Sequence, residues 1–314
     1  MNKFVYKQLH HAAAAVFTAA GIAWIAPATA AETSPVIKIN EATAKADVKA
    51  DTLRGNLTML SGSGGNIIVY NSPDGKLIID AGIAVSKDKI VAALKAIGPE
   101  PVKYLVNTHY HWDHSDGNVW MHEAGATIIG SPQTAAHLAR ETRVDDWDYT
   151  FKPLPKEARP TVLVKGSKRM KFGGETFVMK NFGNGHTDGD LWVHAEKADV
   201  LMLGDTYWNA YYPFIDNEHG GSIGNTIKWA DKAIAASTDK TLIVPGHGAA
   251  SNKAALREWR AMLADVRDKV AALKKQGKSL ADVQAAKPTA TYDAKYGGFV
   301  IDGNFFTKLV YDGL

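Results

Sequence analysis

Short apolar runs, separated by turns that contain glycine, proline and asparagine, recur along most of the chain. Runs of this length that are rich in β-branched and aromatic residues are typical of strands. The predicted strands lie at 53–60, 66–70, 76–80, 104–106, 126–129, 191–195, 200–203 and 242–245. Turn residues at 71–75 and a Gly-Gly pair at 173–174 indicate two hairpins.

Longer stretches place apolar residues three or four positions apart, which is the spacing of one helical face. The predicted helices lie at 86–97, 222–236 and 251–273. Ser86 and Ser251 stand at N-cap positions. The apolar stripe of the third helix should cover one face of a sheet, so it is interpreted as core rather than as a cofactor site. The length of the chain after residue 30 suits one large domain of the α/β fold class.

The first 30 residues have the pattern of a secretory signal peptide. Lys3 and Lys7 give a positive start, and residues 11–26 are mostly apolar. Ala28-Thr29-Ala30 is a cleavage site of small residues. The apolar part is too short and too interrupted for a membrane anchor. The mature protein is therefore expected to be periplasmic or secreted, with no membrane contact after cleavage.

Residues 31–52 are polar and alanine-rich, and they predict an N-terminal arm that is poorly ordered or loosely helical. Residues 53–314 are long enough for one large domain. The chain has no cysteine, which excludes thiolate ligands and cysteine nucleophiles. The formal net charge is only +3, so nothing indicates binding to nucleic acid. A small-molecule substrate is the expected partner, and the oligomeric state stays open.

Four side chains that can bind a metal lie within residues 109–114. The apolar run before them predicts a buried strand, and the polar residues after them predict a turn into a helix. Positions i and i+2 of an extended segment face the same way, so His109 and His111 can converge on one point. Asp113 and His114 follow as the chain turns, and they can serve a second point nearby. Imidazole and carboxylate donors suit Zn²⁺ and its first-row neighbours.

Three further residues of this kind stand where an apolar strand gives way to a turn. His186, Asp205 and His247 each have a glycine directly before them. Strand ends meet at one edge of a sheet architecture, where irregular backbone can open a cleft. Chance surface histidines would not recur at such junctions. The sequence therefore predicts that all seven side chains form one metal site.

The run His-x-His-x-Asp-His, followed later by His, Asp and His, resembles the ligand set of the metallo-β-lactamase superfamily. The resemblance covers nearly the whole mature chain. It implies an αββα sandwich, in which two mixed β-sheets lie face to face with helices outside. It also implies two zinc ions per chain, with iron or manganese as alternatives, bridged by Asp205. The first ion would be held by His109, His111 and His186, and the second by Asp113, His114 and His247.

The same resemblance implies a hydrolase in which metal-activated water attacks a carbonyl, phosphoryl or sulfuryl centre. Asp113 would orient the nucleophile and Asp205 would fix both ions, so both are candidate catalytic residues. β-Lactamases of the superfamily usually carry Cys or Ser in place of the bridging Asp, whereas lactonases, phosphodiesterases and sulfatases carry Asp. The expected substrate is a cyclic amide or ester, that is, a lactam or a lactone. A phosphodiesterase or sulfatase is the alternative, and a non-catalytic binding protein is a third interpretation.

Aromatic residues gather directly after Asp205 and indicate a wall for an apolar or ring-bearing substrate. Tyr207, Trp208 and Tyr212 are the candidate substrate contacts, and either tyrosine is a candidate donor to an oxyanion. The opposite interpretation, that these rings belong to the core, stays open. His219 lies on the same loop and is a weaker candidate for the cleft.

Three other features bear on the site. Asp80, at the end of a predicted strand, is either an outer partner of a metal ligand or a turn acid. Residues 141–160 predict a long surface loop, either packed down by its aromatic residues or forming a lip of the active site. His137 lies in a predicted helix among charged residues and is expected to be solvated.

Overall fold

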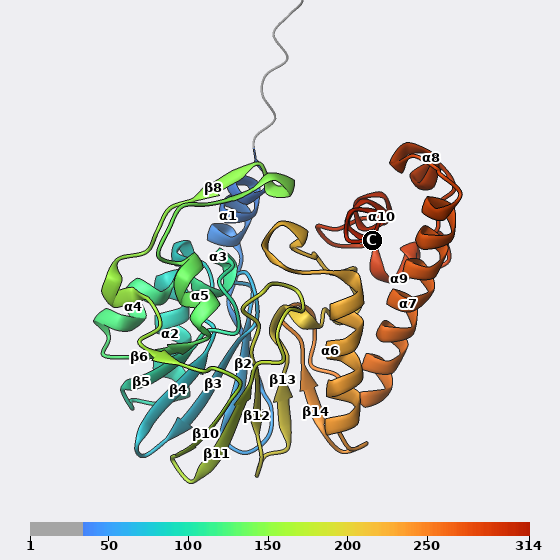
Figure 1. The fold of residues 1–314 in the computed structure, drawn as a ribbon. Helices are drawn as coiled ribbons and strands as arrows, with labels where there is room; N and C mark the ends of the chain where they lie inside the picture. Colours follow the sequence, from blue (N-terminus) through green and yellow to red (C-terminus); the bar gives the residue numbers. More distant parts are fainter. Residues whose placement is uncertain (1–33) are drawn as a thin grey trace, which may run out of the picture. The chain divides into compact units, whose positions relative to one another are not determined.

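Two β-sheets lie face to face, and helices cover the outer side of each sheet (Figure 1). The computed structural model describes residues 34–314, which form one compact unit. The predicted signal peptide, residues 1–30, lies outside the described residues. None of the helices in residues 34–314 combines the length and the apolar character that a membrane span requires.

The first sheet has seven strands in the order β1-β2-β3-β4-β5-β6-β9. Its strands are β1 (Lys49–Thr52), β2 (Leu57–Ser61), β3 (Ile67–Ser72), β4 (Gly75–Ile79), β5 (Val102–Val106), β6 (Thr127–Gly130) and β9 (Val162–Leu163). Strands β1 to β4 pair antiparallel, as their short turns require. Strands β4, β5, β6 and β9 run parallel, with helices in the connections from β4 to β5 and from β5 to β6.

The second sheet has five strands in the order β10-β11-β12-β13-β14. Its strands are β10 (Ser167–Phe172), β11 (Glu175–Lys180), β12 (Trp192–Ala195), β13 (Val200–Met202) and β14 (Leu242–Val244). The first four pair antiparallel, while β13 and β14 run parallel. A separate two-stranded hairpin consists of β7 (Thr142–Val144) and β8 (Tyr149–Phe151).

The helices lie on the outer faces of the two sheets, except for α1, which lies beside β8, and for α8 and α10, which contact α7 and each other (Figure 1). They are α1 (Pro35–Lys45), α2 (Lys87–Ile97), α3 (Trp112–Ser115), α4 (Asn118–Glu123), α5 (Pro132–His137), α6 (Ile223–Ala236), α7 (Lys253–Lys275), α8 (Leu280–Ala285), α9 (Asp293–Tyr296) and α10 (Gly303–Asp312). Short 3-10 helices are η1 (Ala84–Ser86), η2 (Asp145–Trp147), η3 (Lys156–Ala158), η4 (Gly204–Thr206) and η5 (Asn217–His219).

Alternate residues of the central strands pack into different layers of the core. In β3, Ile68 and Tyr70 point between the two sheets, whereas Ile67 and Val69 point toward the layer of α2 and α4. In β13, Leu201 points instead toward α6 and α7. Because strand side chains alternate between faces, apolar residues on both faces require a layer on both sides of each sheet. The result is the predicted αββα sandwich.

The described part of the predicted N-terminal arm, residues 34–52, contains a helix and a strand. Residues 35–45 form α1, with Val36 fully buried in the core beside Trp147, and β1 pairs with β2. Lys89 Nζ donates hydrogen bonds to the carbonyl oxygens of Ala44 and Ala46, at 2.7 and 2.5 Å. Residues 34–52 therefore belong to the same compact unit as residues 53–314, because these tertiary contacts hold a segment that is only weakly apolar.

Two local predictions also need correction. The stretch 141–160 is not a plain loop, because it contains the β7–β8 hairpin and a buried Trp147. The N-cap of α7 is Asn252 rather than Ser251, and its side chain accepts a hydrogen bond from the backbone of Ala255.

Candidate metal centre

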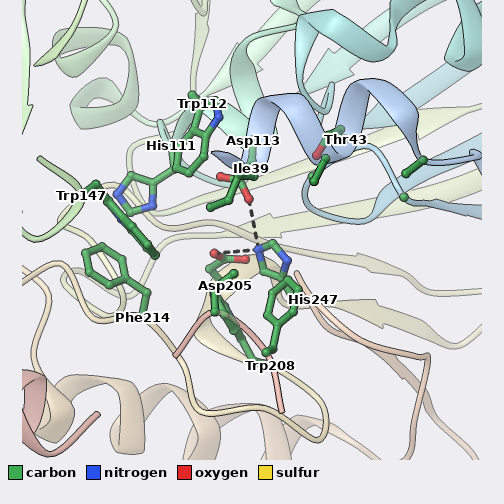
Figure 2. A pocket seen from close by; sticks show the side chains of 16 residues that line it. Ile39, Thr43, His111, Trp112, Asp113, Trp147, Asp205, Trp208, Phe214 and His247 are labelled. Carbon is green, nitrogen blue, oxygen red and sulfur yellow. Dashed lines mark ion pairs between the residues drawn. The ribbon is translucent and has the colours of Figure 1, made fainter. Parts of the chain in front are cut away.

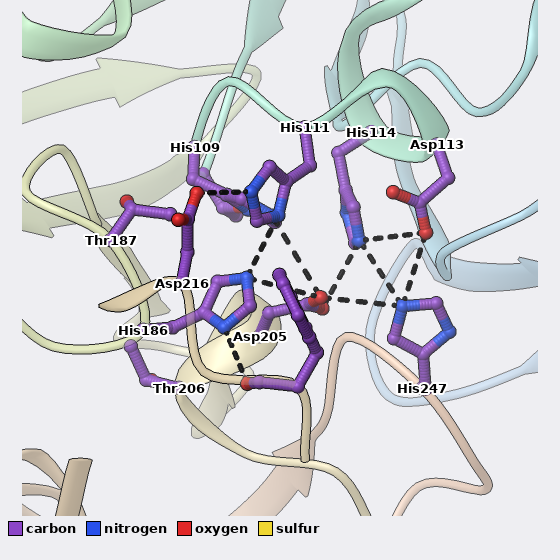
Figure 3. A network of polar contacts seen from close by, with 12 residues as sticks. His109, His111, Asp113, His114, His186, Thr187, Asp205, Thr206, Asp216 and His247 are labelled. Carbon is purple, nitrogen blue, oxygen red and sulfur yellow. Dashed lines mark hydrogen bonds and ion pairs between the residues drawn. The ribbon is translucent and has the colours of Figure 1, made fainter. Parts of the chain in front are cut away.

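The seven predicted donors meet at one end of the sandwich, where strands of both sheets end (Figure 3). They form two adjacent groups, and the donor atoms within each group lie within 4.8 Å of one another. The first group comprises His109, His111, His186 and Asp205, and the second comprises Asp113, His114 and His247. All seven side chains are buried.

Parallel pairing explains why residues distant in sequence converge here. Strands β4 and β5 run parallel, so Asp80 and Thr108 emerge side by side. Strands β13 and β14 also run parallel, so Asp205 and His247 emerge together. A Cβ on Gly246 would overlap the Asp205 carboxylate, which explains why glycine stands at that close approach.

The histidines of the first group direct unprotonated ring nitrogens toward a common point. His111 Nε2 bonds to the Asp216 carboxylate at 3.0 Å, and His186 Nδ1 donates to the carbonyl oxygen of Phe214 at 2.8 Å. These outer bonds place the protons on the outer nitrogens. His111 Nδ1 and His186 Nε2 therefore face each other at 2.9 Å with lone pairs, an arrangement that a cation between them would stabilise.

The histidines of the second group lie beside the carboxylates of Asp113 and Asp205. His114 Nδ1 bonds to Asp80 at 2.8 Å, so its Nε2 faces inward. His247 Nε2 lies 3.2 Å from Asp113 Oδ2. Asp205 stands between the two groups, 3.6 Å from His186 Nε2 and 3.1 Å from His114 Nε2. His109 Nε2 is buried and has no hydrogen-bond partner within residues 34–314, which again leaves a donor for a cation.

The pKa values show a site built for positive charge. Burial lowers the pKa of His186 to about 4, so its ring is neutral and can donate a lone pair. Burial alone would raise the pKa of Asp205, but the nearby His114 and His247 outweigh it and hold that pKa well below its usual value. Burial likewise opposes protonation of His247, yet the carboxylates of Asp205 and Asp113 raise its pKa to about 9. These residues fit two divalent cations, because the buried carboxylates need compensating positive charge.

A model of the metallo-β-lactamase superfamily matches residues 60–247, a range that contains all seven donors. The chain belongs to this superfamily. Members of this superfamily are generally hydrolytic metalloenzymes. The two groups of donors agree with a dinuclear metal centre.

Solved structures of the superfamily share the fold at low sequence identity. A metallo-β-lactamase from Pontibacter korlensis superposes with a TM-score of 0.56 and 16% identity, over 70% of this chain and 100% of that chain. A metallo-β-lactamase from Hirschia baltica gives 0.55 and 18%, over 69% and 98%. A stereoselective inverting sec-alkylsulfatase from Pseudomonas sp. gives 0.65 and 14%, over 86% of this chain and 51% of that chain. The predicted fold class is thereby confirmed.

Outer partners of the ligands were only partly foreseen from the sequence. Asp80 accepts hydrogen bonds from the backbone and hydroxyl of Thr108, both at 2.7 Å, besides contacting His114. It is therefore the outer partner of a donor, and not only a turn acid. Asp216 was not identified from the sequence as a site residue. It directly follows the apolar run Phe214-Ile215, just as Asp80 and Asp205 follow apolar strands. Its carboxylate also accepts a hydrogen bond from Tyr110, so it orients the ring of His111.

The two remaining histidines near the site take supporting positions. His219 Nδ1 contacts Asp216 at 2.8 Å, so His219 stands behind His111 rather than in the cleft. His137 is buried, not solvated as predicted. Its Nε2 lies 3.0 Å from the Asp188 carboxylate, and its ring stacks on Tyr110 with centroids 4.2 Å apart. Asp188 thus supplies a hydrogen-bonding partner for this buried ring.

A cavity of about 310 Å³ opens beside the donors (Figure 2). Trp208, a predicted substrate contact, lines it, with its ring centroid 4.2 Å from that of His247. Tyr207 and Tyr212 do not line it, so the structure places them in the core instead. The Tyr207 hydroxyl bonds to Asn209 and Ser251, and Tyr212 packs in the layer of α7 and α10.

The predicted oxyanion donors are thus directed elsewhere. The Tyr212 hydroxyl donates to Asp293 at 2.9 Å, away from the metal donors. In contrast, Trp147 and Phe214 line the cavity. Phe214 belongs to the aromatic run after Asp205, and Trp147 to the 141–160 region that was considered as a lip of the active site. A pattern of apolar rings cannot tell which ring faces a cleft, because that depends on tertiary packing.

Proposed function

We propose that the protein is an exported, dinuclear zinc-dependent hydrolase, β-lactamase-like in fold, that opens a cyclic amide or ester. The observation that carries this proposal is the convergence of seven buried donors on two adjacent points beside a cavity. Zinc suits imidazole and carboxylate donors, and iron or manganese would suit the same set. When bound, two zinc ions would supply Lewis acidity at the carbonyl and a water nucleophile at neutral pH.

The chain's own residues would orient the reactants and hold protons. Asp113 lines the cavity and contacts His247 through Oδ2, and we assign its Oδ1 to accept the proton of the attacking water. Asp205 keeps the two groups of donors at a fixed separation. Asp80 and Asp216 hold the rings of His114 and His111 in the orientation that directs one nitrogen inward.

Two features favour a lactone over a lactam that carries an acid group. Asp205 stands where β-lactamases of the superfamily usually carry Cys or Ser. Within residues 34–314, no lysine or arginine lines the cavity, so the carboxylate of a lactam would find no cationic side chain there.

A hydrolysis panel on zinc-loaded mature protein tests this function. The panel should contain lactones, lactams, aryl phosphodiesters, and alkyl and aryl sulfates. We expect lactones to be cleaved fastest and chelation to abolish cleavage. His109→Ala should remove activity, whereas His122→Ala, a change at an exposed histidine on α4, should not. Hydrolysis that survives both chelation and His109→Ala would refute the proposal.

The second candidate is a phosphodiesterase or sulfatase that uses the same donors. The bridging Asp205 is the observation that favours it, since these enzymes share it with lactonases. Faster turnover of a phosphodiester or sulfate than of any lactone in the panel would select this candidate. A non-catalytic binding protein is the least favoured alternative, because loss of a metal ligand is the usual sign of such a protein and all seven donors are in place.

Export is proposed from the N-terminal sequence alone. Cleavage near Ala30 should leave a mature chain in the periplasm or medium, and N-terminal sequencing of that fraction tests it. An intact Met1 on protein from the cytoplasm would contradict this part of the proposal.

A further inference from the structure

The cavity beside the metal donors has walls from several separate parts of the chain (Figure 2). Helix α1 supplies one wall and residues 299–300 supply another, and both lie outside the range that the superfamily model matches. Trp147 and Phe214 line it as well. The volume of about 310 Å³ lies at the lower end of ligand pockets, which suits one small group.

Helix α1 presents a continuous face to this cavity. Ile39, Ala42, Thr43 and Ala46 all line it, and their spacing of three and four residues places them on one side of the helix. The helix is fixed in place from its other sides. Asn40 accepts a hydrogen bond from the Trp112 indole at 3.0 Å, besides the bonds from Lys89 to the end of the helix. This wall is therefore formed before a substrate arrives.

The wall from residues 299–300 keeps apolar side chains exposed. Phe299 and Val300 are 45% and 37% exposed, so both hold apolar area at the mouth of the cavity. The ring of Phe299 lies 4.8 Å from that of Tyr211 and 5.9 Å from that of His247. Apolar side chains that stay exposed beside a polar centre commonly mark a binding surface.

Charge in the cavity is confined to the metal donors. Asp113, Asp205, His111 and His247 reach its floor, and they are committed to the two cations. No other ionisable side chain among residues 34–314 lines it. An ionic substituent bound between α1 and Phe299 would therefore lose its hydration without gaining a partner, which is costly.

We propose that α1 and the segment 299–300 form a specificity pocket for an uncharged, apolar substituent attached beside the scissile bond. This inference rests on the proposed hydrolase function and names its substrate class as neutral esters or lactones with an alkyl or aryl group. The superfamily core supplies the metal donors, and the two flanking segments select the substrate.

The direct test uses γ-lactones with unbranched alkyl substituents of increasing length. Each methylene that enters the pocket should raise kcat/KM by about fourfold, until the pocket is full. A lactone of the same length with a terminal carboxylate should react at least about tenfold more slowly, because that carboxylate lacks a partner. A flat dependence on length, or equal rates for the carboxylate analogue, would overturn the pocket.

Matched variants of α1 locate the effect. Ala42→Phe fills the cavity face of the helix and should reduce the ratio of long-chain to short-chain kcat/KM by about tenfold or more, the loss of two to three buried methylenes. Ala44→Phe places the same ring on an exposed position that does not line the cavity, and that ratio should not change. Both variants keep all seven donors, so two bound ions per chain would show that each has folded. Equal effects of the two substitutions would contradict the assignment of α1 as the wall.

A binding measurement separates failure of this inference from failure of the proposed function. Neutral n-alkylamides of increasing length serve as non-hydrolysed probes, and calorimetry gives their affinity for the metal-loaded protein. If no substrate is cleaved but amide affinity rises with length and falls in Ala42→Phe, the function is wrong and the pocket stands. If lactones are cleaved but neither rate nor affinity depends on length, the pocket is wrong and the function stands.

Discussion

At the scale of single residues, Asp205 decides whether the two groups of donors act together. Its carboxylate lies close to ring nitrogens of both groups, His186 in the first and His114 in the second. The side chain is almost fully buried. Asp205→Asn keeps the shape and removes the charge. We expect affinity for the second ion to fall by at least about 100-fold, with a larger effect on kcat than on KM. Metal titration and steady-state kinetics measure both.

The matched control is Asp231→Asn, which removes a charge from an exposed ion pair with Arg260. It should change neither metal content nor turnover, because exposed ion pairs contribute little. If Asp205→Asn behaves like this control, Asp205 is only a strand-end acid and does not bridge two ions.

Asp216 is the second residue with a testable role, acting through His111 rather than on the substrate. Its carboxylate accepts hydrogen bonds from Tyr110, His111 and His219, and an amide cannot accept from all three. Asp216→Asn should therefore weaken binding of the first ion by about 10- to 100-fold. Competition with a chelator measures this loss.

Asp188→Asn is the control for the Asp216 experiment, since Asp188 pairs with His137 in the same region but touches no donor. The proposed role of Asp216 fails if both variants bind the first ion equally well. Asp216→Glu offers a further check, because a carboxylate of different reach should restore part of the affinity.

The residues that the sequence could predict are those whose local pattern carries their chemistry. Each metal donor follows an apolar strand and lies beside a turn, so position and residue type together indicated its role. Tyr207 and Trp208 are neighbours with similar patterns, yet only Trp208 reaches the cavity. Which of two adjacent rings faces a cleft is decided by packing across the chain, and no local pattern contains that information.

At the scale of elements, periodicity predicted the central strands and the long helices, but it did not locate α1 or the short strands β1, β7, β8 and β9. In β3 and β13 both faces are apolar, so the pattern is strong and the strands were recognised. In α1 only Val36 and Thr43 are buried, and its remaining faces are polar or lie along the cavity. A helix that is held by side-chain hydrogen bonds and a few apolar contacts leaves little signal in the sequence.

The contact between β4 and the loop from α2 to β5 depends on one buried lysine. Lys76 on β4 is 1% exposed, and its Nζ donates to the carbonyl oxygens of Gly98 and Glu100 at 2.8 and 2.6 Å. Burial lowers the pKa of Lys76, although Glu100 opposes this shift. Lys76→Met keeps the apolar stem and leaves both carbonyls without their donor. We expect the free energy of unfolding to fall by about 2 kcal/mol.

Urea unfolding of metal-loaded protein measures that loss. Lys95→Met, at an exposed position in the last turn of α2, is the control and should change stability by less than about 0.5 kcal/mol. If the free energy of unfolding falls equally in the two variants, the hydrogen bonds to Gly98 and Glu100 stabilise the fold no more than an exposed lysine does.

At the scale of the whole molecule, the metal centre joins the two halves of the sandwich. Asp113 and His114 follow β5 of the first sheet, while Asp205 and His247 follow β13 and β14 of the second. Ions held between these groups stabilise the folded chain only, because the donors are far apart when it is unfolded. Removal of the ions should therefore lower Tm, and at a free metal concentration 1,000 times Kd the stabilisation would be about 4 kcal/mol.

This coupling should depend on pH with a definite sign. Without ions, the neighbouring carboxylates outweigh burial and raise the pKa of His247 to about 9, so its ring carries a proton at pH 7.5. Because the pKa of His247 is higher in the folded chain than in the unfolded chain, its protonation stabilises the metal-free fold. This stabilisation is complete when the pH is below the unfolded pKa near 6.5, and it is lost as the pH rises toward 9. Metal binding instead requires a neutral ring, so it strengthens over the same range. The difference in Tm between loaded and metal-free protein should widen from pH 6 to pH 9.

Proton release tests the same linkage without unfolding the protein. Zinc binding at pH 7.5 should release at least one proton per chain, which calorimetry in buffers of different ionisation enthalpy detects. His247→Gln cannot carry that proton, so its release should be smaller by up to one proton per chain, while His122→Ala should match the unaltered protein. If zinc binds without proton release, the donors around Asp113 and Asp205 are not protonated in the metal-free state. The stability of the empty centre would then arise from packing between the sheets rather than from its buried ion pairs.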